Sequence, residues 1–113
     1  MYNLENELSK LNDDSTIKDI QEYINKMLLA RGFKGQSKQE IMLLLTEEIG
    51  ELAKEVRKST NMKIDQNDPK EDEISDEIAD VFIYILTMCD EYDIDLMQAL
   101  INKEKKNIKR VWK

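Results

Sequence analysis

The sequence of 113 residues contains no histidine and a single cysteine, Cys89. The lack of histidine excludes Ser-His and Cys-His catalysis and metal sites that depend on imidazole ligands. One cysteine cannot form an intrachain disulfide or a thiolate metal cluster, so we expect a reduced, cytoplasmic protein. Proline occurs once and glycine three times. A chain so poor in helix-breaking residues favours an all-α fold.

Long hydrophobic runs are also missing. The longest apolar stretch, residues 81–86, is far shorter than the roughly 20 residues of a membrane-spanning helix. Residues 1–5 show no signal-peptide pattern. Acidic residues outnumber basic ones by 24 to 17, for a net charge of −7. Because nucleic acids need a basic surface, we do not expect a nucleic acid as a partner. The short apolar runs likewise argue against a membrane as a partner.

Capping signals divide the chain into four main helices within one domain, residues 1–113. The helices are expected at about residues 17–31, 38–60, 69–92 and 96–113. Their predicted starts are marked by residues 13–16, Ser37, Asp68–Pro69 and Asp95. A leucine stripe in residues 4–11 predicts a short additional helix at the N-terminus. Short connections between the helices indicate an antiparallel four-helix bundle.

The third predicted main helix is apolar on two sides. One side carries Ile74, Ile78, Val81, Ile85 and Met88, and the other carries Phe82, Ile83 and Leu86. A narrow polar stripe lies between them and consists of Glu73, Asp76, Glu77, Asp80, Tyr84 and Thr87. A helix with two apolar sides in so small a protein needs more to pack against than its own bundle. We therefore expect a homodimer or homotetramer to complete the core.

Two pairs of acids stand three residues apart, Glu48 with Glu51 and Glu77 with Asp80. Such a spacing places both acids of a pair on nearly the same helix face, here toward the bundle interior. Like charges a few Å apart repel by roughly 4 kcal/mol at an effective dielectric constant near 20, and a divalent cation removes that conflict. Oxygen ligands alone favour Mg²⁺ or Mn²⁺. The alternative is a solvated acidic face near Lys54 and Lys58.

Two further features are open to two interpretations each. Gly50 stands inside a helix, where glycine costs about 1 kcal/mol relative to alanine, and close approach of another helix or of a ligand would explain it. Lys103, Asn107 and Arg110 share one face of the last predicted helix. They could hold phosphate oxygens, or the basic segment could simply complement the helix dipole.

Together these residues resemble a known family. The stretch Leu45-Thr46-Glu47-Glu48-Ile49-Gly50-Glu51-Leu52-Ala53-Lys54, followed by Asp76-Glu77-Ile78-Ala79-Asp80-Val81, resembles the EExxE…ExxD signature of the MazG-like all-α nucleoside triphosphate pyrophosphohydrolases. The basic tail, Lys103 to Arg110, is similar to the closing helix of that family. The resemblance extends over about residues 16–112.

The resemblance implies Mg²⁺-dependent hydrolysis of a nucleoside triphosphate to the monophosphate and pyrophosphate, in a house-cleaning role on (d)NTPs. Glu47 and Glu48 would be catalytic, with Glu47 as a further ligand or as the group that orients the attacking water. The resemblance further implies metal ligands and phosphate ligands, the latter from the same or a neighbouring subunit: Glu48, Glu51, Glu77 and Asp80 for the metal, and Lys103, Asn107 and Arg110 for the phosphates. Phe33, together with Tyr23, would stack on the base; the alternative is that both aromatic side chains belong to the core.

Two other functions remain open. Phosphoribosyl-ATP pyrophosphohydrolases share a similar acidic signature. A non-catalytic helical module that binds a nucleotide or a protein would need no divalent metal. A di-iron carboxylate bundle is disfavoured, because it normally takes a histidine from each of two helices.

Overall fold

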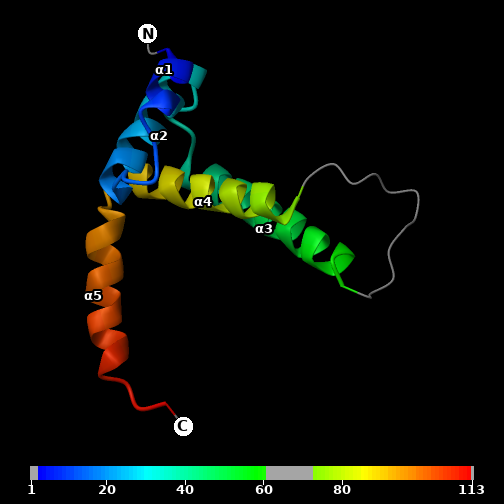
Figure 1. The fold of residues 1–113 in the computed structure, drawn as a ribbon, viewed down its shortest axis with the longest axis vertical. Coiled ribbons are helices and arrows are strands. Elements are labelled where there is room, and N and C mark those ends of the chain that lie inside the picture. The colour runs from blue at the N-terminus through cyan, green and yellow to red at the C-terminus, as the bar shows by residue number, and fades with distance from the viewer. Residues whose placement is uncertain (1–2, 61–72, 113) are drawn as a thin grey trace. The chain divides into compact units, whose positions relative to one another are not determined.

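The computed structural model describes residues 3–60 and 73–112, and within these ranges the chain is helical and contains no strand (Figure 1). The helices are α1 (Leu4–Ser9), α2 (Ile17–Arg31), α3 (Lys38–Lys58), α4 (Ile74–Glu91) and α5 (Leu96–Ile108). The predicted all-α class and the short N-terminal helix are confirmed. None of the described helices has the length and apolar character that crossing a membrane requires.

The chain divides into two compact units. The first, called here the α2–α5 unit, consists of Met1–Gly35 and Cys89–Lys113; the second, the α3–α4 unit, consists of Gln36–Met88. The helix α4 therefore belongs to the α3–α4 unit along most of its length and to the α2–α5 unit at its last turn. Each unit is described by itself.

Local capping explains where α2 begins and ends. Thr16 and Asp19 form a capping box, in which each side chain accepts a hydrogen bond from the backbone N–H of the other. Along α2, Ile24, Met27 and Leu28 are buried at the i, i+3, i+4 spacing of a single helix face. The helix stops at Gly32, whose φ of 72° is left-handed and suits a residue without a Cβ.

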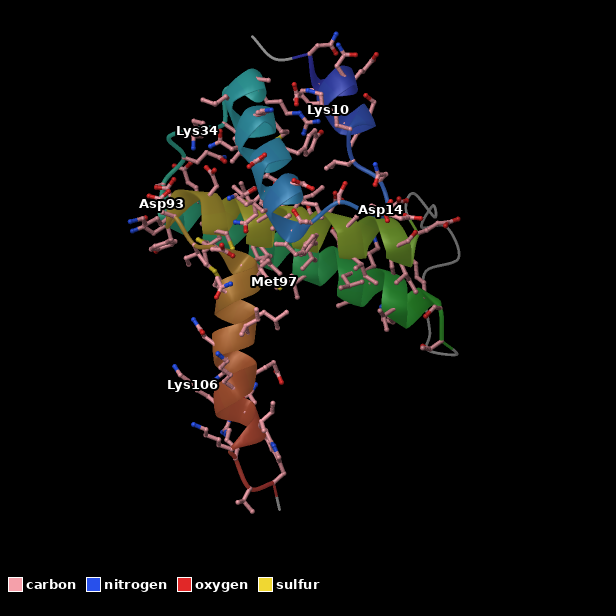
Figure 2. The ribbon with its side chains drawn as sticks, turned by 60° about the vertical axis from the view of Figure 1, so that its left-hand side comes forward. Lys10, Asp14, Lys34, Asp93, Met97 and Lys106 are labelled. Carbon is pink, nitrogen blue, oxygen red and sulfur yellow. The ribbon has the colours of Figure 1, made fainter. Side chains whose placement is uncertain are left out.

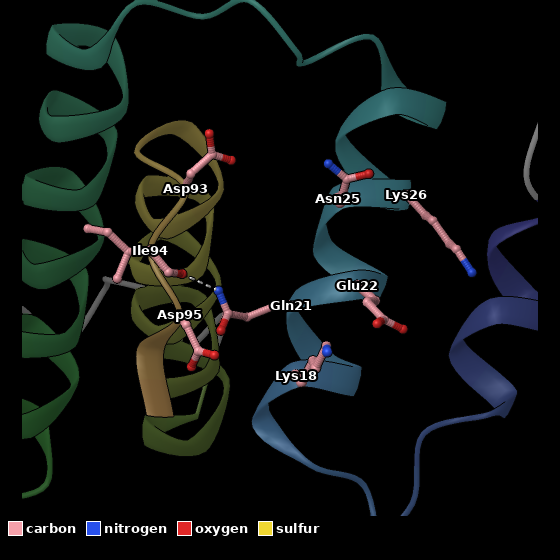
Figure 3. A pocket seen from close by; sticks show the side chains of 8 residues that line it. All are labelled: Lys18, Gln21, Glu22, Asn25, Lys26, Asp93, Ile94 and Asp95. Atoms are coloured by element: carbon pink, nitrogen blue, oxygen red, sulfur yellow. Dashed lines mark hydrogen bonds between the residues drawn. The ribbon is translucent and has the colours of Figure 1, made fainter. Parts of the chain in front are cut away.

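The side-chain amide of Gln21 fixes the turn between α4 and α5 (Figure 3). Its Nε2 donates a hydrogen bond to the carbonyl oxygen of Ile94 (2.8 Å), and its Oε1 accepts one from the backbone N–H of Leu96 (3.0 Å). Asp93, in the same turn, has a positive φ of 53°, which only a few non-glycine residues adopt readily. The first turn of α5 is thus tied to α2 through one residue.

The start predicted for the third main helix and the end predicted for the last helix differ from the structure. The predicted cap at Asp68–Pro69 lies outside the described residues, and α4 begins at Ile74. There the carbonyl oxygen of Glu73 accepts a hydrogen bond from the N–H of Glu77 (3.2 Å). The prediction that the last helix reaches the C-terminus is wrong, because α5 ends at Ile108. Hydrogen bonds of the i to i−3 type from Lys109 and Arg110 tighten its last turn and end the α-helical pattern.

In the α3–α4 unit the two helices lie side by side in both views (Figures 1 and 2). The packing of α4 partly reverses the expectation from its sequence. On the predicted apolar side, Ile78 is 54% and Ile85 36% exposed. On the predicted polar stripe, Glu77 is only 2% exposed and Thr87 is buried. The hydroxyl of Thr87 donates to the carbonyl oxygen of Ile83 (2.8 Å), so its polarity is satisfied within the helix, whereas Glu77 brings a carboxylate into the interior.

Candidate metal centre

Three carboxylates converge from the two helices of the α3–α4 unit. Glu48 projects from α3, and Glu77 and Asp80 project from successive turns of α4. One oxygen atom of each lies within 4.8 Å of an oxygen of both others. The i, i+3 spacing on α4 aligns two acids along one face, and the adjacent α3 supplies the third.

The surroundings of Glu48 oppose its negative charge. Glu77 is buried, and Glu48 and Asp80 are half-buried. The pKa of the Glu48 carboxyl is raised above its usual range, first by burial and then by the charges of Asp80 and Glu51, while a hydrogen bond with Glu77 acts in the opposite direction. Burial and like charge both disfavour ionisation of an acid.

A divalent cation fits this group of side chains. The ligand atoms available are carboxylate oxygens, which are the donors that Mg²⁺ and Mn²⁺ prefer. A bound cation would also offset the repulsion that raises the pKa of Glu48.

The other two predicted acids lie at the edge of this cluster. Glu51, predicted as a fourth ligand, is exposed and is not one of the three converging carboxylates. Glu47 is exposed as well. Both are still close enough for their charges to raise the pKa of Glu48. The roles assigned to Glu47 and Glu51 stay predictions.

Tyr84 is a residue of this site to which sequence reasoning gave no role. It is half-buried on α4, one helical turn after Asp80. Its pKa is raised by burial and by the charges of Glu48, Asp80 and Glu47, so its phenol lies near the cluster. Its position on the polar stripe of the helix was the signal that could have identified it.

The predicted phosphate-binding and base-stacking residues belong to the α2–α5 unit. Lys103 is exposed on α5, and Asn107 is half-buried and donates a hydrogen bond to Glu104 (3.0 Å). Arg110 follows the end of α5 and lies 4.9 Å from the centre of the Trp112 ring. Phe33 is exposed after the end of α2. These four assignments stay predictions.

An open pocket of the α2–α5 unit lies between α2 and the turn after α4 (Figure 3). It is lined by Lys18, Gln21, Glu22, Asn25, Lys26, Asp93, Ile94 and Asp95. Basic and acidic side chains are mixed in it, and it contains none of the metal-binding, phosphate-binding or base-stacking residues predicted from the sequence. Tyr23 is half-buried and lines a smaller pocket on the side of α2 that faces α1.

Two comparisons with known proteins find similarity to this chain. The family model of the MazG nucleotide pyrophosphohydrolase domain matches residues 36–112. Among solved structures, the crystal structure of the candidate pyrophosphatase YpjD from Bacillus subtilis is similar, with a TM-score of 0.72 and 30% sequence identity. That match covers 88% of this chain and 100% of the other. No curated protein matches the chain.

Proposed function

The chain belongs to the MazG nucleotide pyrophosphohydrolase family, and on this premise we propose that it hydrolyses nucleoside triphosphates to the monophosphate and pyrophosphate with Mg²⁺ or Mn²⁺. The observation that carries the proposal is the group formed by Glu48, Glu77 and Asp80, whose oxygens lie within 4.8 Å of one another. The substrate class proposed is the (d)NTPs, in a house-cleaning role in the cytoplasm.

The carboxylates of the α3–α4 unit would hold the metal. Glu77 is buried, while Glu48 and Asp80 remain partly open to a ligand. A bound divalent cation would neutralise phosphate oxygens and lower the pKa of a water molecule. Glu51 would complete the site as a ligand at its exposed edge.

The reaction needs a base beside the attacking water, and we assign this role to Glu47. Its charge affects both Glu48 and Tyr84, which places it beside the cluster, and its carboxylate is exposed. The water oxygen forms a bond to the α-phosphorus, and its proton passes to the carboxylate of Glu47. The bond from the α-phosphorus to the bridging oxygen breaks, and pyrophosphate leaves with that electron pair.

Substrate binding is assigned to the cationic end of α5 and to one aromatic side chain. Lys103, Asn107 and Arg110 would contact the triphosphate, and Phe33 would stack on the base. An exposed cation, an amide and a guanidinium are suitable groups for phosphate oxygens. These contacts would offset the acidic charge of the chain around an anionic substrate.

Pyrophosphate release from a panel of canonical and modified (d)NTPs tests the proposal, with Mg²⁺, Mn²⁺ or EDTA present. Glu48→Gln and Asp80→Asn are expected to lower kcat at least about 100-fold, because each removes a charged ligand from the cluster. Glu91→Gln changes an exposed acid at the end of α4 and serves as the matched control. It is expected to leave the rate unchanged.

Metal-independent release, or full activity in both cluster variants, would refute the proposed metal site. Release from phosphoribosyl-ATP alone would move the substrate class to that nucleotide. An unmodified chain that releases pyrophosphate from none of these substrates and binds no detectable Mg²⁺ would favour a non-catalytic helical module.

A further inference from the structure

A short turn after α2 carries Phe33, whose side chain is 48% exposed. The two glycines of this turn, Gly32 and Gly35, have positive φ angles of 72° and 90°. The N–H of Phe33 donates a hydrogen bond to the carbonyl oxygen of Leu28 (2.8 Å), as in the Schellman ending of a helix. The backbone of the turn is thus attached to α2 as far as Phe33.

The next residue, Lys34, attaches the turn to the end of α4. Its Nζ donates a hydrogen bond to Oδ2 of Asp90 (2.6 Å), and Oδ1 of Asp90 accepts another from Nδ2 of Asn25 on α2 (2.8 Å). Figure 2 shows Lys34 in the turn after α2, and Figure 3 shows Asn25 on α2. The Asp90 side chain is only 13% exposed. All of these residues belong to the α2–α5 unit.

The helix α4 itself does not account for an acid at position 90. Asp90 stands in the last turn of α4, next to Glu91, and that turn contains no basic residue. Acids are unfavourable there, because the helix dipole is negative at the C-terminus. The two hydrogen bonds that the Asp90 carboxylate accepts offset this cost. Asp90 is therefore explained by its contacts with Asn25 and Lys34.

Such an attachment matters for an aromatic side chain that binds a flat ring. Glycine adopts many backbone conformations, so a turn with a glycine on each side of Phe33 is intrinsically adaptable. A side chain that must be ordered when its ligand binds lowers the affinity for that ligand. The ion pair of Lys34, one residue after Phe33, supplies part of this order before the ligand arrives.

We propose that Lys34 and Asp90 are positioning residues for the base of the substrate, because their ion pair holds the turn from which Phe33 stacks on that base. The inference rests on the proposed function and deepens it by naming what sets the affinity for the base. Lys34 acts through Phe33, and its ammonium group is engaged by Asp90. The ion pair therefore contributes to binding and not to the chemical step, which changes KM and leaves kcat alone.

Equilibrium binding tests the proposal with two kinds of probe, measured by calorimetry on the full chain with Mg²⁺. The α,β-methylene analogues of dATP and dCTP carry a base and resist cleavage, whereas inorganic triphosphate has no base. Lys34→Met should weaken binding of the analogues about fivefold and leave binding of inorganic triphosphate unchanged. With cleavable (d)NTPs, it should raise KM by the same factor at unchanged kcat. Lys34→Arg keeps a cation for Asp90 and should bind the analogues as the unmodified chain does.

Two more variants complete the comparison. Asp90→Asn keeps an oxygen for Asn25 but removes the charge that pairs with Lys34, so it should reproduce the effects of Lys34→Met. Lys10→Met is the matched control, because it removes an exposed lysine of the same unit from an ion pair with Glu7 (3.3 Å). It should change neither KM nor the binding of either kind of probe. Circular dichroism should show unchanged helix content in all of these variants.

A double-mutant cycle separates positioning from a direct contact with phosphate. Phe33→Ala should weaken binding of the analogues about tenfold or more, because stacking on the base is lost. In that background Lys34→Met should cost less than about twofold, since Lys34 acts through Phe33. Independent losses in the two variants, or an equal loss with inorganic triphosphate, would mean that Lys34 binds phosphate itself and would overturn the proposal. Unchanged analogue binding in both Lys34→Met and Asp90→Asn would overturn it as well.

The same measurements distinguish a failure of this proposal from a failure of the proposed hydrolysis. A chain that releases no pyrophosphate but binds the analogues more weakly after Lys34→Met refutes the hydrolysis and supports the positioning role. A chain that hydrolyses (d)NTPs with the same KM before and after Lys34→Met supports the hydrolysis and refutes the positioning role. A chain that neither hydrolyses (d)NTPs nor binds the analogues refutes both.

Discussion

At the scale of single residues, Glu48 on α3 is the side chain whose pKa responds to the charge of Asp80 on α4. Its carboxyl lies among Asp80, Glu51 and Glu77, and its pKa is raised. The folded protein therefore binds the Glu48 proton more tightly than the unfolded chain does. The ordinary pKa of a glutamate carboxyl is 4.5. The contribution of Glu48 to folding stability is fully present below that pH and is lost as the pH rises through its raised pKa in the folded protein.

Glu48→Gln should change thermal stability in opposite ways with and without metal. Without metal at pH 7, the variant is expected to melt above the unmodified chain, because glutamine carries no charge to repel Asp80. With Mg²⁺ at about 100 times its dissociation constant, the unmodified chain should gain about 2.7 kcal/mol, or about 10 °C in melting temperature. The variant should lose most of that gain, as scanning calorimetry with and without MgCl₂ would show.

The control for this measurement is again Glu91→Gln, whose melting temperature should rise with Mg²⁺ as in the unmodified chain. An equal rise in Glu48→Gln would mean that Glu48 does not bind the cation. A metal-free variant that melts below the unmodified chain would contradict the assigned repulsion.

At the scale of the elements, the starts of α1, α2, α3 and α5 follow from a few adjacent residues, but the direction of α5 depends on a contact distant in sequence. The start of α5 is capped by the Asp95 side chain, which accepts from the N–H of Gln98 (3.1 Å). Its attachment to α2 depends on Gln21, which lies 75 residues before Leu96. A cap is local and can be recognised in the sequence, whereas a side-chain contact across such a separation cannot.

Gln21→Ala should loosen the start of α5 without melting the helix. The change removes two hydrogen bonds to backbone groups and is expected to cost about 1–3 kcal/mol of unfolding free energy. Hydrogen exchange of the Leu96 amide should accelerate, and urea unfolding would give the free energy. Gln39→Ala, at an exposed position in the first turn of α3, is the control. It should leave exchange of the Leu96 amide unchanged and should change the unfolding free energy by no more than about 0.5 kcal/mol. Unchanged exchange at Leu96 would show that α5 is held in another way.

At the scale of the whole molecule, the chain consists of two compact units that share α4. The acidic cluster lies in the α3–α4 unit, and the pocket lined by Gln21 lies in the α2–α5 unit. A ligand of the cluster therefore acts first on α3 and α4.

Hydrogen exchange along the chain should show this division. Mg²⁺ is expected to slow exchange about tenfold or more in the parts of α3 and α4 that carry Glu48, Glu77 and Asp80, because it joins the two helices. Exchange in α1 and in the first turns of α2 should change little. Protection confined to the pocket of the α2–α5 unit would place the cation there instead and refute the metal centre.

The sequence by itself determined the helical class and most of the helix starts. Thr16, Ser37 and Asp95 cap their helices as predicted, because a cap depends only on the next three residues. It also determined which acids could meet, since i, i+3 spacing on a helix is fixed by the backbone. The end of α5 was predicted wrongly, because its composition stays compatible with a helix beyond Ile108.

Only the tertiary structure decided which of those acids converge. Glu48, Glu77 and Asp80 meet while Glu51 stays exposed, and the polar stripe of α4 brings Glu77 inward while Ile78 is left exposed. Periodicity gives the faces of a helix, but it does not say which face another helix covers. That choice depends on how α3 and α4 pack against each other, and packing is a property of residues far apart in the chain.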